Sequence, residues 1–154
     1  MDDNPKLSKI VSGAQTGVDR AALDVALTLG FPCGGWVPKG RRAEDGRVPV
    51  SYPMRETGGS GYPERTLLNV RDSDATLILT CGEPSGGTAL TLEYAINLNR
   101  PHRVVDLLDG TSTEEIREWI EEEEVVVLNV AGPRESTSPG IYDQAAEFLK
   151  ALLA

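Results

Sequence analysis

The chain has 154 residues, 40% of them hydrophobic, and its 15 basic and 24 acidic side chains give a formal net charge of -9. This length fits one domain over 1–154, and the excess of acids argues against nonspecific binding to nucleic acid or to an anionic membrane. No stretch approaches the roughly 18 apolar residues of a membrane span, and Met1–Pro5 is not a basic leader. Cys33 and Cys81 have no metal-binding or disulfide-framework spacing. We therefore expect a cytoplasmic protein without a metal site.

Short β-branched apolar runs alternate with amphipathic segments along the chain, and a long insertion at 38–63 is rich in Gly, Pro and Arg. The predicted elements are, in chain order, a strand at 9–12, a helix at 19–29, an irregular strand at 31–37, a short helix at 64–71, a strand at 75–80, a helix at 87–99, a strand at 103–107, a helix that follows the hydroxyl residues 111–113 and ends near 122, a strand at 125–130 and a helix at 141–153. This alternation predicts an α/β fold of three layers, a doubly wound parallel sheet of about five strands of Rossmann-like type. The wholly apolar run at 125–130 is typical of a central strand.

Three glycine-rich loops follow predicted strands and open predicted helices, at 12–20, 81–88 and 131–140. Ligands of such sheets bind outside the carboxyl ends of the strands, so the three loops should meet at one edge. Their glycines allow close backbone approach, and the helix starts present free N–H groups to an anion. The spacing matches neither the Walker loop nor Gly-x-Gly-x-x-Gly. The loops therefore predict a site for an anionic small molecule.

The predicted ligand contacts come from these loops and from one face of the short helix at 64–71. They are Gly13, Ala14, Gln15, Thr16, Gly17, Asp19, Arg20, Arg65, Asn69, Ser85, Gly86, Gly87, Thr88, Gly132, Arg134 and Ser136. Arg134 could clamp a phosphate or could be a solvated loop residue. Asp19 could contact ligand hydroxyls or only the helix dipole, and the glycines could serve only tight turns. The arginines between 41 and 65 could cover the ligand, although Glu44, Asp45 and other acids nearby partly neutralise them.

Three stretches of this sequence resemble the molybdenum-carrier family. They are Ser12-Gly13-Ala14-Gln15-Thr16-Gly17-Val18-Asp19-Arg20, Pro84-Ser85-Gly86-Gly87-Thr88 and Asn129-Val130-Ala131-Gly132-Pro133-Arg134-Glu135-Ser136. The family is a circularly permuted branch of the superfamily of molybdenum cofactor carriers and lysine-decarboxylase-like phosphoribohydrolases. The resemblance covers about 9–153 and implies strand order 2-1-5-3-4, with the closest ligand contacts at 132–140 and 85–88. It also implies a molybdenum cofactor (molybdopterin) or a nucleotide-like ligand, and a homo-oligomer, either dimer or tetramer.

The resemblance leaves an enzyme as one alternative. Phosphoribohydrolase relatives carry Pro-Gly-Gly-x-Gly-Thr-x-x-Glu, whose Glu acts on an N-glycosidic bond, whereas here Glu93 lies five residues after Thr88. Glu93 is the candidate catalytic acid/base of a nucleoside-monophosphate phosphoribohydrolase, with Arg134 or Arg65 orienting the phosphate. A nucleotide-sensing binding module is a further alternative. The different Glu spacing favours a non-catalytic carrier or binding protein.

Overall fold

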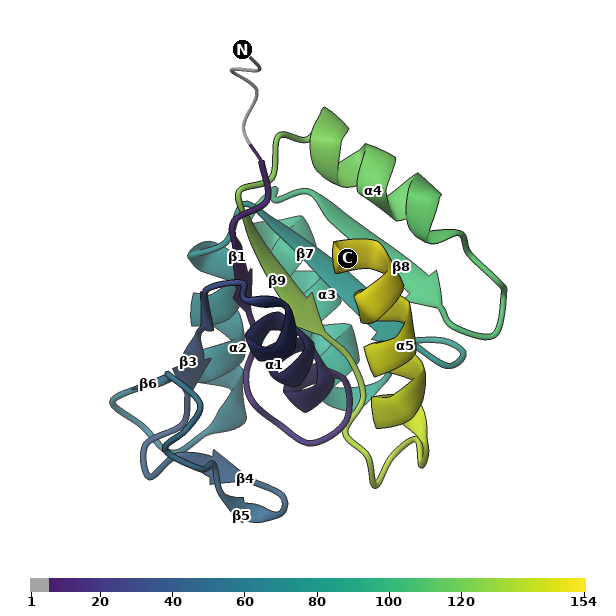
Figure 1. The fold of residues 1–154 in the computed structure, drawn as a ribbon. Helices are drawn as coiled ribbons and strands as arrows, with labels where there is room; N and C mark the ends of the chain where they lie inside the picture. Colours follow the sequence, from purple (N-terminus) through teal and green to yellow (C-terminus); the bar gives the residue numbers. More distant parts are fainter. Residues whose placement is uncertain (1–5) are drawn as a thin grey trace.

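The computed structural model describes residues 6–154, so the expectation for Met1–Pro5 falls on residues that lie outside the described ones. A five-stranded parallel sheet forms the centre, in the order β2-β1-β9-β7-β8 (Figure 1). Its strands are β1 (Lys9–Val11), β2 (Cys33–Gly34), β7 (Ala75–Thr80), β8 (His102–Asp106) and β9 (Val127–Ala131). These are the five predicted strands, so the predicted order 2-1-5-3-4 is confirmed.

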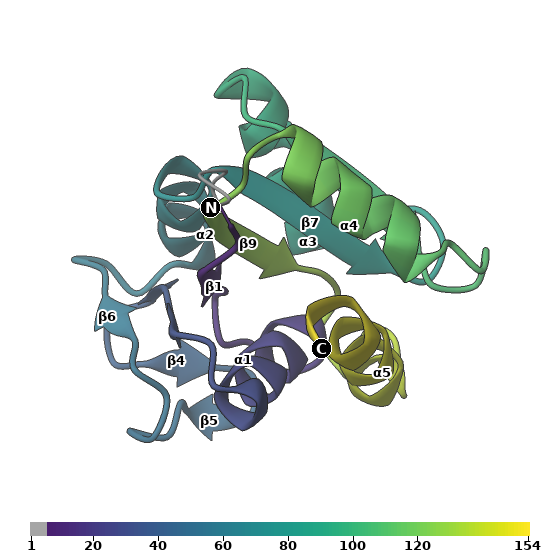
Figure 2. The ribbon, with the colours of Figure 1, turned by 45° about the horizontal axis from the view of Figure 1, so that its top comes forward.

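Helices cover both faces of the sheet, as predicted for a doubly wound fold. They are α1 (Val18–Leu29), α2 (Tyr62–Arg71), α3 (Gly86–Asn97), α4 (Thr113–Glu122) and α5 (Ile141–Leu153). Figures 1 and 2 show α1, α4 and α5 on one face and α2 and α3 on the other. Gly30 ends α1 in the left-handed conformation, with φ of 80°, which glycine adopts without a Cβ penalty. No helix within the described part of the chain is long and apolar enough to cross a bilayer.

β9 is the central strand and pairs on both sides, with β1 through Ile10 and Leu128 and with β7 through Thr76 and Asn129. Leu128 and Val130 are fully buried, as are Ile10 and Leu77 on the neighbouring strands. Burial of each such side chain contributes roughly 1.5–3 kcal/mol to folding. β9 begins two residues later than predicted, but its central place follows from the apolar run that the sequence shows. The carboxyl ends of β1, β9 and β7 therefore lie side by side.

The predicted irregular strand at 31–37 is divided between two sheets. Gly35, with φ of 136°, separates β2 from β3 (Trp36–Val37), and a Cβ there would lie 2.2 Å from the carbonyl oxygen of Ser12. The chain therefore leaves the main sheet, and β3 pairs with β6 (Arg55–Glu56) in the insertion.

The sequence predicted no strand or helix in the insertion at 38–63, yet the insertion contributes β6. It also contains a short hairpin of β4 (Arg42–Ala43) and β5 (Gly46–Arg47). Buried Val37, Ala43 and Val48 pack with Leu23 of α1 in a small second core. These few apolar side chains fix the insertion against α1, beside the ends of the strands.

Candidate functional site

A cleft of about 700 Å³ lies where β1, β7 and β9 end, between the loops that follow them and α2. The predicted contact residues that line it are Gly13, Gln15, Asp19, Arg65, Asn69, Ser85, Gly86, Gly87, Thr88, Gly132, Arg134 and Ser136. The topology thus brings segments from four parts of the chain to one place. A cleft of this size lies within the range of about 300–1,000 Å³ that is usual for small-molecule sites.

The remaining predicted residues do not line the cleft. Ala14 and Gly17 are buried inside the loop after β1, and Thr16 and Arg20 bind the insertion. Glu93, the candidate acid/base, is exposed on α3. A catalytic carboxylate has to come within hydrogen-bond reach of the reacting group. The geometry therefore gives Glu93 no support as the acid/base.

Three glycines in the loops after β1 and β9 are required by contacts within the protein. A Cβ on Gly132 would lie 2.2 Å from the carbonyl oxygen of Leu79, and a Cβ on Gly17 would lie 2.3 Å from that of Pro133. A Cβ on Gly13 would meet Nη1 of Arg65 at 1.8 Å. These are distances that real Cβ atoms essentially never show. These contacts within the protein are sufficient to explain why glycine is present at the three positions, without a role in ligand binding.

The glycines that open α3 have no such contacts. A Cβ added to Gly86 or Gly87 would meet nothing within 4 Å, and both residues are exposed to the cleft. Gly86 has a positive φ of 53°, which explains its identity, but Gly87 has no unusual φ. Neither packing nor backbone conformation therefore requires glycine at Gly87. The space beside it is open to a ligand.

The helices differ in whether a side chain of the protein already accepts hydrogen bonds from the backbone N–H groups at their starts. The carboxylate of Glu135 accepts hydrogen bonds from Gly140 N and Tyr142 N at the start of α5, the latter at 2.9 Å. Ser112 Oγ accepts from Glu115 N at the start of α4. Among the helices of residues 6–154, α3 alone has neither an acidic residue in its first turn nor a side-chain cap. Thr88 N donates to the carbonyl oxygen of Ser85 at 3.1 Å. The start of α3 therefore offers an anion the N–H groups of Gly86 and Gly87 and the positive end of the helix dipole.

Asp19 and Arg65 form a buried ion pair in the cleft. Oδ2 of Asp19 accepts from Nη1 of Arg65 at 3.2 Å and from the backbone N–H of Gln15 at 3.4 Å. Burial raises the pKa of Asp19 to about 6, although the charge and hydrogen bonds of Arg65 and the N–H of Gln15 act in the opposite direction. Asp19 is therefore a carboxylate whose charge is costly in the folded state.

The other arginines of the site are also paired with acids. Arg20 contacts both carboxylate oxygens of Asp45, at 3.0 and 3.2 Å, and also bonds the carbonyl oxygen of Ala14. Arg134 Nη1 lies 3.9 Å from Oε1 of Glu44. The predicted phosphate clamp thus already has an anionic neighbour. Glu44 and Asp45 both come from the tip of the β4–β5 hairpin.

Tyr62 is surrounded by three guanidinium groups. Those of Arg42, Arg65 and Arg134 lie 4.9, 5.2 and 5.4 Å from the centre of its ring, distances typical of cation–π contacts. Tyr62 itself lines the cleft at the start of α2. Three positively charged side chains therefore lie around one ring on this side of the cleft.

Two buried nitrogen donors in residues that line the cleft have no hydrogen-bond partner in the described chain, Nε2 of Gln15 and Nε of Arg65. Both residues are more than nine-tenths buried. Buried donors without a partner cost about 1–3 kcal/mol each, so such atoms call for an acceptor. Asn69 differs, because its side-chain amide bonds both N and O of Trp36, at 2.7 and 3.1 Å, and so holds β3 in place.

Several residues of the cleft were not predicted. They are Tyr62, Pro63, Thr66, Leu90, Thr91, Asn129 and Ala131, whereas Pro133 and Thr137 lie within the predicted stretch 132–140. Asn129 is the one with a readable signal, because it is a polar residue inside the most apolar strand, and it is 2% exposed. Its amide bonds Thr76 Oγ1 at 3.3 Å. The described residues contain no group of three or more His, Cys, Asp or Glu placed to hold a metal ion.

Comparison with known proteins gives a family for this geometry. Residues 10–153 match the family described as the circularly permutated YpsA SLOG family. A crystal structure at 1.45 Å resolution, named "Putative molybdenum carrier protein" and from Syntrophus aciditrophicus SB, is 46% identical with a TM-score of 0.91. The similarity covers 100% of this chain and 99% of that one. No curated protein matches the chain. Together with the observed strand order, the match over nearly all residues shows that the chain belongs to the circularly permuted YpsA SLOG family.

Proposed function

We propose that this protein binds a small phosphorylated molecule in the cleft, with the phosphate at the start of α3, and carries it without converting it. The observation behind this proposal is the first turn of α3, which is without acid or cap among the described helices. Ser85, Gly87 and Thr88 all line the cleft there. Free N–H groups and the helix dipole favour a phosphate at such a position. The unpartnered donors of Gln15 and Arg65 support a ligand that brings acceptor oxygens.

The molybdenum cofactor is the proposed cargo, because a protein that is 46% identical carries the name of a molybdenum carrier. The residues present fit such a ligand in two respects. The start of α3 suits a terminal phosphate, and Tyr62 and Leu90 offer aromatic and apolar surface to a pterin ring. A nucleotide shares this chemistry and is the alternative ligand. Hydrolysis of a nucleotide has less support, because Glu93 does not line the cleft.

Thermal unfolding of the wild type, Gly87→Asp and Gly58→Asp tests the phosphate position. Both substitutions add one carboxylate at a glycine whose Cβ position is open, but only Gly87 is at a helix start in the cleft. The ligands are inorganic phosphate, pyrophosphate, AMP, GMP, anaerobically prepared molybdopterin, and molybdate. At a hundred times its Kd, a ligand stabilises the folded state by about 2.7 kcal/mol, which is roughly 5–10 °C for a chain of this size.

We expect at least one phosphorylated ligand to stabilise the wild type and Gly58→Asp by this amount, and Gly87→Asp by much less. The proposal fails if no phosphorylated ligand shifts the unfolding midpoint, or if Gly87→Asp responds as the wild type does. Carriage and catalysis are separated by analysing the nucleotides after incubation. Free base that is released by the wild type and not by Glu93→Ala would replace the carrier with a phosphoribohydrolase.

A further inference from the structure

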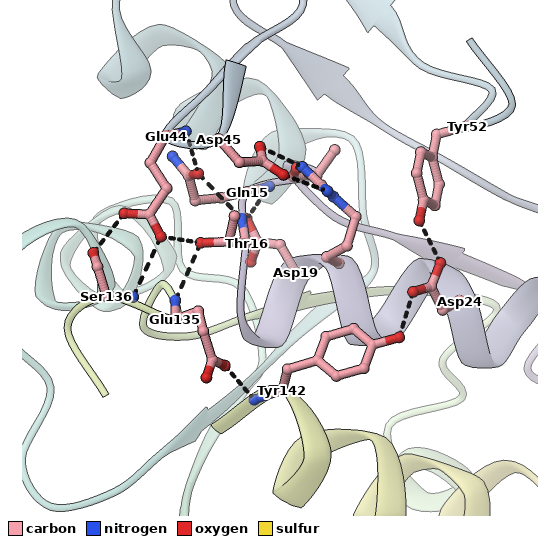
Figure 3. A network of polar contacts seen from close by, with 12 residues as sticks. Gln15, Thr16, Asp19, Asp24, Glu44, Asp45, Tyr52, Glu135, Ser136 and Tyr142 are labelled. Carbon is pink, nitrogen blue, oxygen red and sulfur yellow. Dashed lines mark hydrogen bonds and ion pairs between the residues drawn. The ribbon is translucent and has the colours of Figure 1, made fainter. Parts of the chain in front are cut away.

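The carboxylate of Glu44 lies among donors that are suited to an oxyanion (Figure 3), beside Ser136, which lines the cleft. It accepts hydrogen bonds from Thr16 Oγ1, from Ser136 Oγ, and from Ser136 N at 3.3 Å. Arg134 Nη1 lies 3.9 Å away. We call these donors of Thr16, Ser136 and Arg134 the Glu44 seat. Two hydroxyls, one backbone N–H and a guanidinium are together a donor set typical of phosphate sites.

The Glu44 seat belongs to the same edge of the sheet as the cleft. Thr16 follows β1, whereas Arg134 and Ser136 follow β9 and line the cleft. Burial raises the pKa of Glu44, but the hydrogen bonds from Ser136 and Thr16 and the charge of Arg134 outweigh it, so that the pKa is lowered overall. The seat therefore stabilises a negative charge. The group that supplies this charge in the structure comes from the chain itself.

The hairpin that presents Glu44 is small. β4 and β5 pair through only two residues each, so the hairpin depends on the packing of Ala43 and Val48 in the second core for its stability. Its tip is held by the contacts of Glu44, by the ion pair of Asp45 with Arg20, and by the bond of 2.8 Å from Glu44 N to Gln15 Oε1. The buried Ala43 anchors its base. The tip can therefore leave the seat without disrupting the main core.

We propose that the Glu44 seat is a second anion site, and that a tetrahedral oxyanion group of the ligand displaces Glu44 from it. This inference rests on the proposed function, because it takes the ligand of the cleft to be anionic. With one site at the start of α3 and another at the seat, the cleft selects a ligand with two anionic groups. Glu44 then competes with weak or singly charged ligands and lowers their affinity.

Calorimetric titration with inorganic phosphate tests the competition. Glu44→Gln removes the competing charge, and Glu122→Gln, on the exposed end of α4, removes one charge away from the cleft. We expect Glu44→Gln to bind phosphate about tenfold more tightly than the wild type, Glu122→Gln to match the wild type, and Ser136→Ala to reverse the gain when added to Glu44→Gln. Equal or weaker phosphate binding by Glu44→Gln would overturn the proposal, because Glu44 would then only hold the hairpin.

Hydrogen exchange of the wild type gives a measurement that needs no variant. We expect saturating pyrophosphate to accelerate exchange of Glu44 N–H and of its neighbours in the hairpin several-fold, because Gln15 no longer accepts from Glu44. Unchanged or slower exchange in bound protein would overturn the displacement.

Combining Glu44→Gln with Gly87→Asp separates this inference from the proposed function. A gain from Glu44→Gln that survives Gly87→Asp supports the seat even if the α3 site fails. Loss of binding in Gly87→Asp together with no gain from Glu44→Gln rejects the seat and retains the proposed function.

Discussion

The loops that open α3 and α5 are alike in sequence but differ in what occupies them. Both follow strands of the central sheet, both contain glycines, both lead into a helix, and both contribute residues to the lining of the cleft. At α5 the carboxylate of Glu135 accepts from the first N–H groups, whereas at α3 no side chain does. A glycine-rich loop at a strand end is therefore weak evidence of a ligand. What distinguishes the two is whether a carboxylate of the protein already occupies the place of the anion.

The largest difference in stability should come from adding one methyl group to a glycine in each of the two loops. Gly132→Ala places a Cβ against the backbone of β7, and we expect a loss of about 3 kcal/mol, or roughly 10 °C in Tm. Gly87→Ala meets nothing in the protein, so its stability should stay within about 0.5 kcal/mol, while phosphate affinity falls. Urea unfolding and calorimetric titration of both variants measure this. Equal losses of stability would break the distinction between the two loops.

The pH dependence of the unfolding free energy tests whether the carboxyl of Asp19, in the loop after β1, is buried as the structure shows. Burial raises the folded-state pKa of Asp19 to about 6 against the opposing effect of Arg65, whereas an unfolded Asp titrates near pH ~3.9. The folded state binds this proton more tightly, so the stabilising contribution is full below about pH 4 and is lost as pH rises through about 6. Relative to Asp19→Asn, the wild type should lose about 2–3 kcal/mol of unfolding free energy between pH 4 and pH 7.

Urea unfolding of the two proteins at a series of pH values measures this difference. Asp109→Asn, at an exposed position, serves as the control and should follow the wild type at every pH. If the unfolding free energies of the wild type and Asp19→Asn changed in parallel with pH, Asp19 would titrate as an exposed carboxyl. The loop after β1 would then bury this side chain less completely than the structure shows.

A smaller effect should follow from removing the Glu135 carboxylate from the start of α5. Glu135→Ala removes the carboxylate that accepts from Gly140 N and Tyr142 N, which should cost about 1 kcal/mol of stability. The variant should also bind inorganic phosphate more tightly, since α5 then resembles α3. Glu147→Ala, on the exposed side of α5, is the matched control for both measurements. Unchanged phosphate binding in Glu135→Ala would show that the carboxylate is not what separates the two loops.

The sequence predicted the sheet well, because strand and helix periodicity and the apolar run of β9 are local patterns. It did not predict the break at Gly35, which depends on the approach of Ser12, a residue distant in the chain. The site was predicted as a set of loops with the closest contacts at 132–140 and 85–88, but the sequence did not show that Glu135 already accepts from the N–H groups at the start of α5. Glu44 and Ser136 are 92 residues apart, so their contact leaves no local pattern. The acids near the arginines of the insertion indicated that their charges are partly neutralised. They did not indicate that Glu44 occupies a position suited to an anion.

The permuted strand order has a consequence for folding during synthesis. β2 pairs with β1, and β8 pairs with β7, but only β9 joins these two pairs into one sheet. Because β9 follows all the others in the chain, a growing polypeptide exposes two separate half-sheets with unpaired edges until its central strand emerges. Long-range pairings of this kind form slowly. The cleft, which needs the loops of both halves, cannot form before that last strand is inserted.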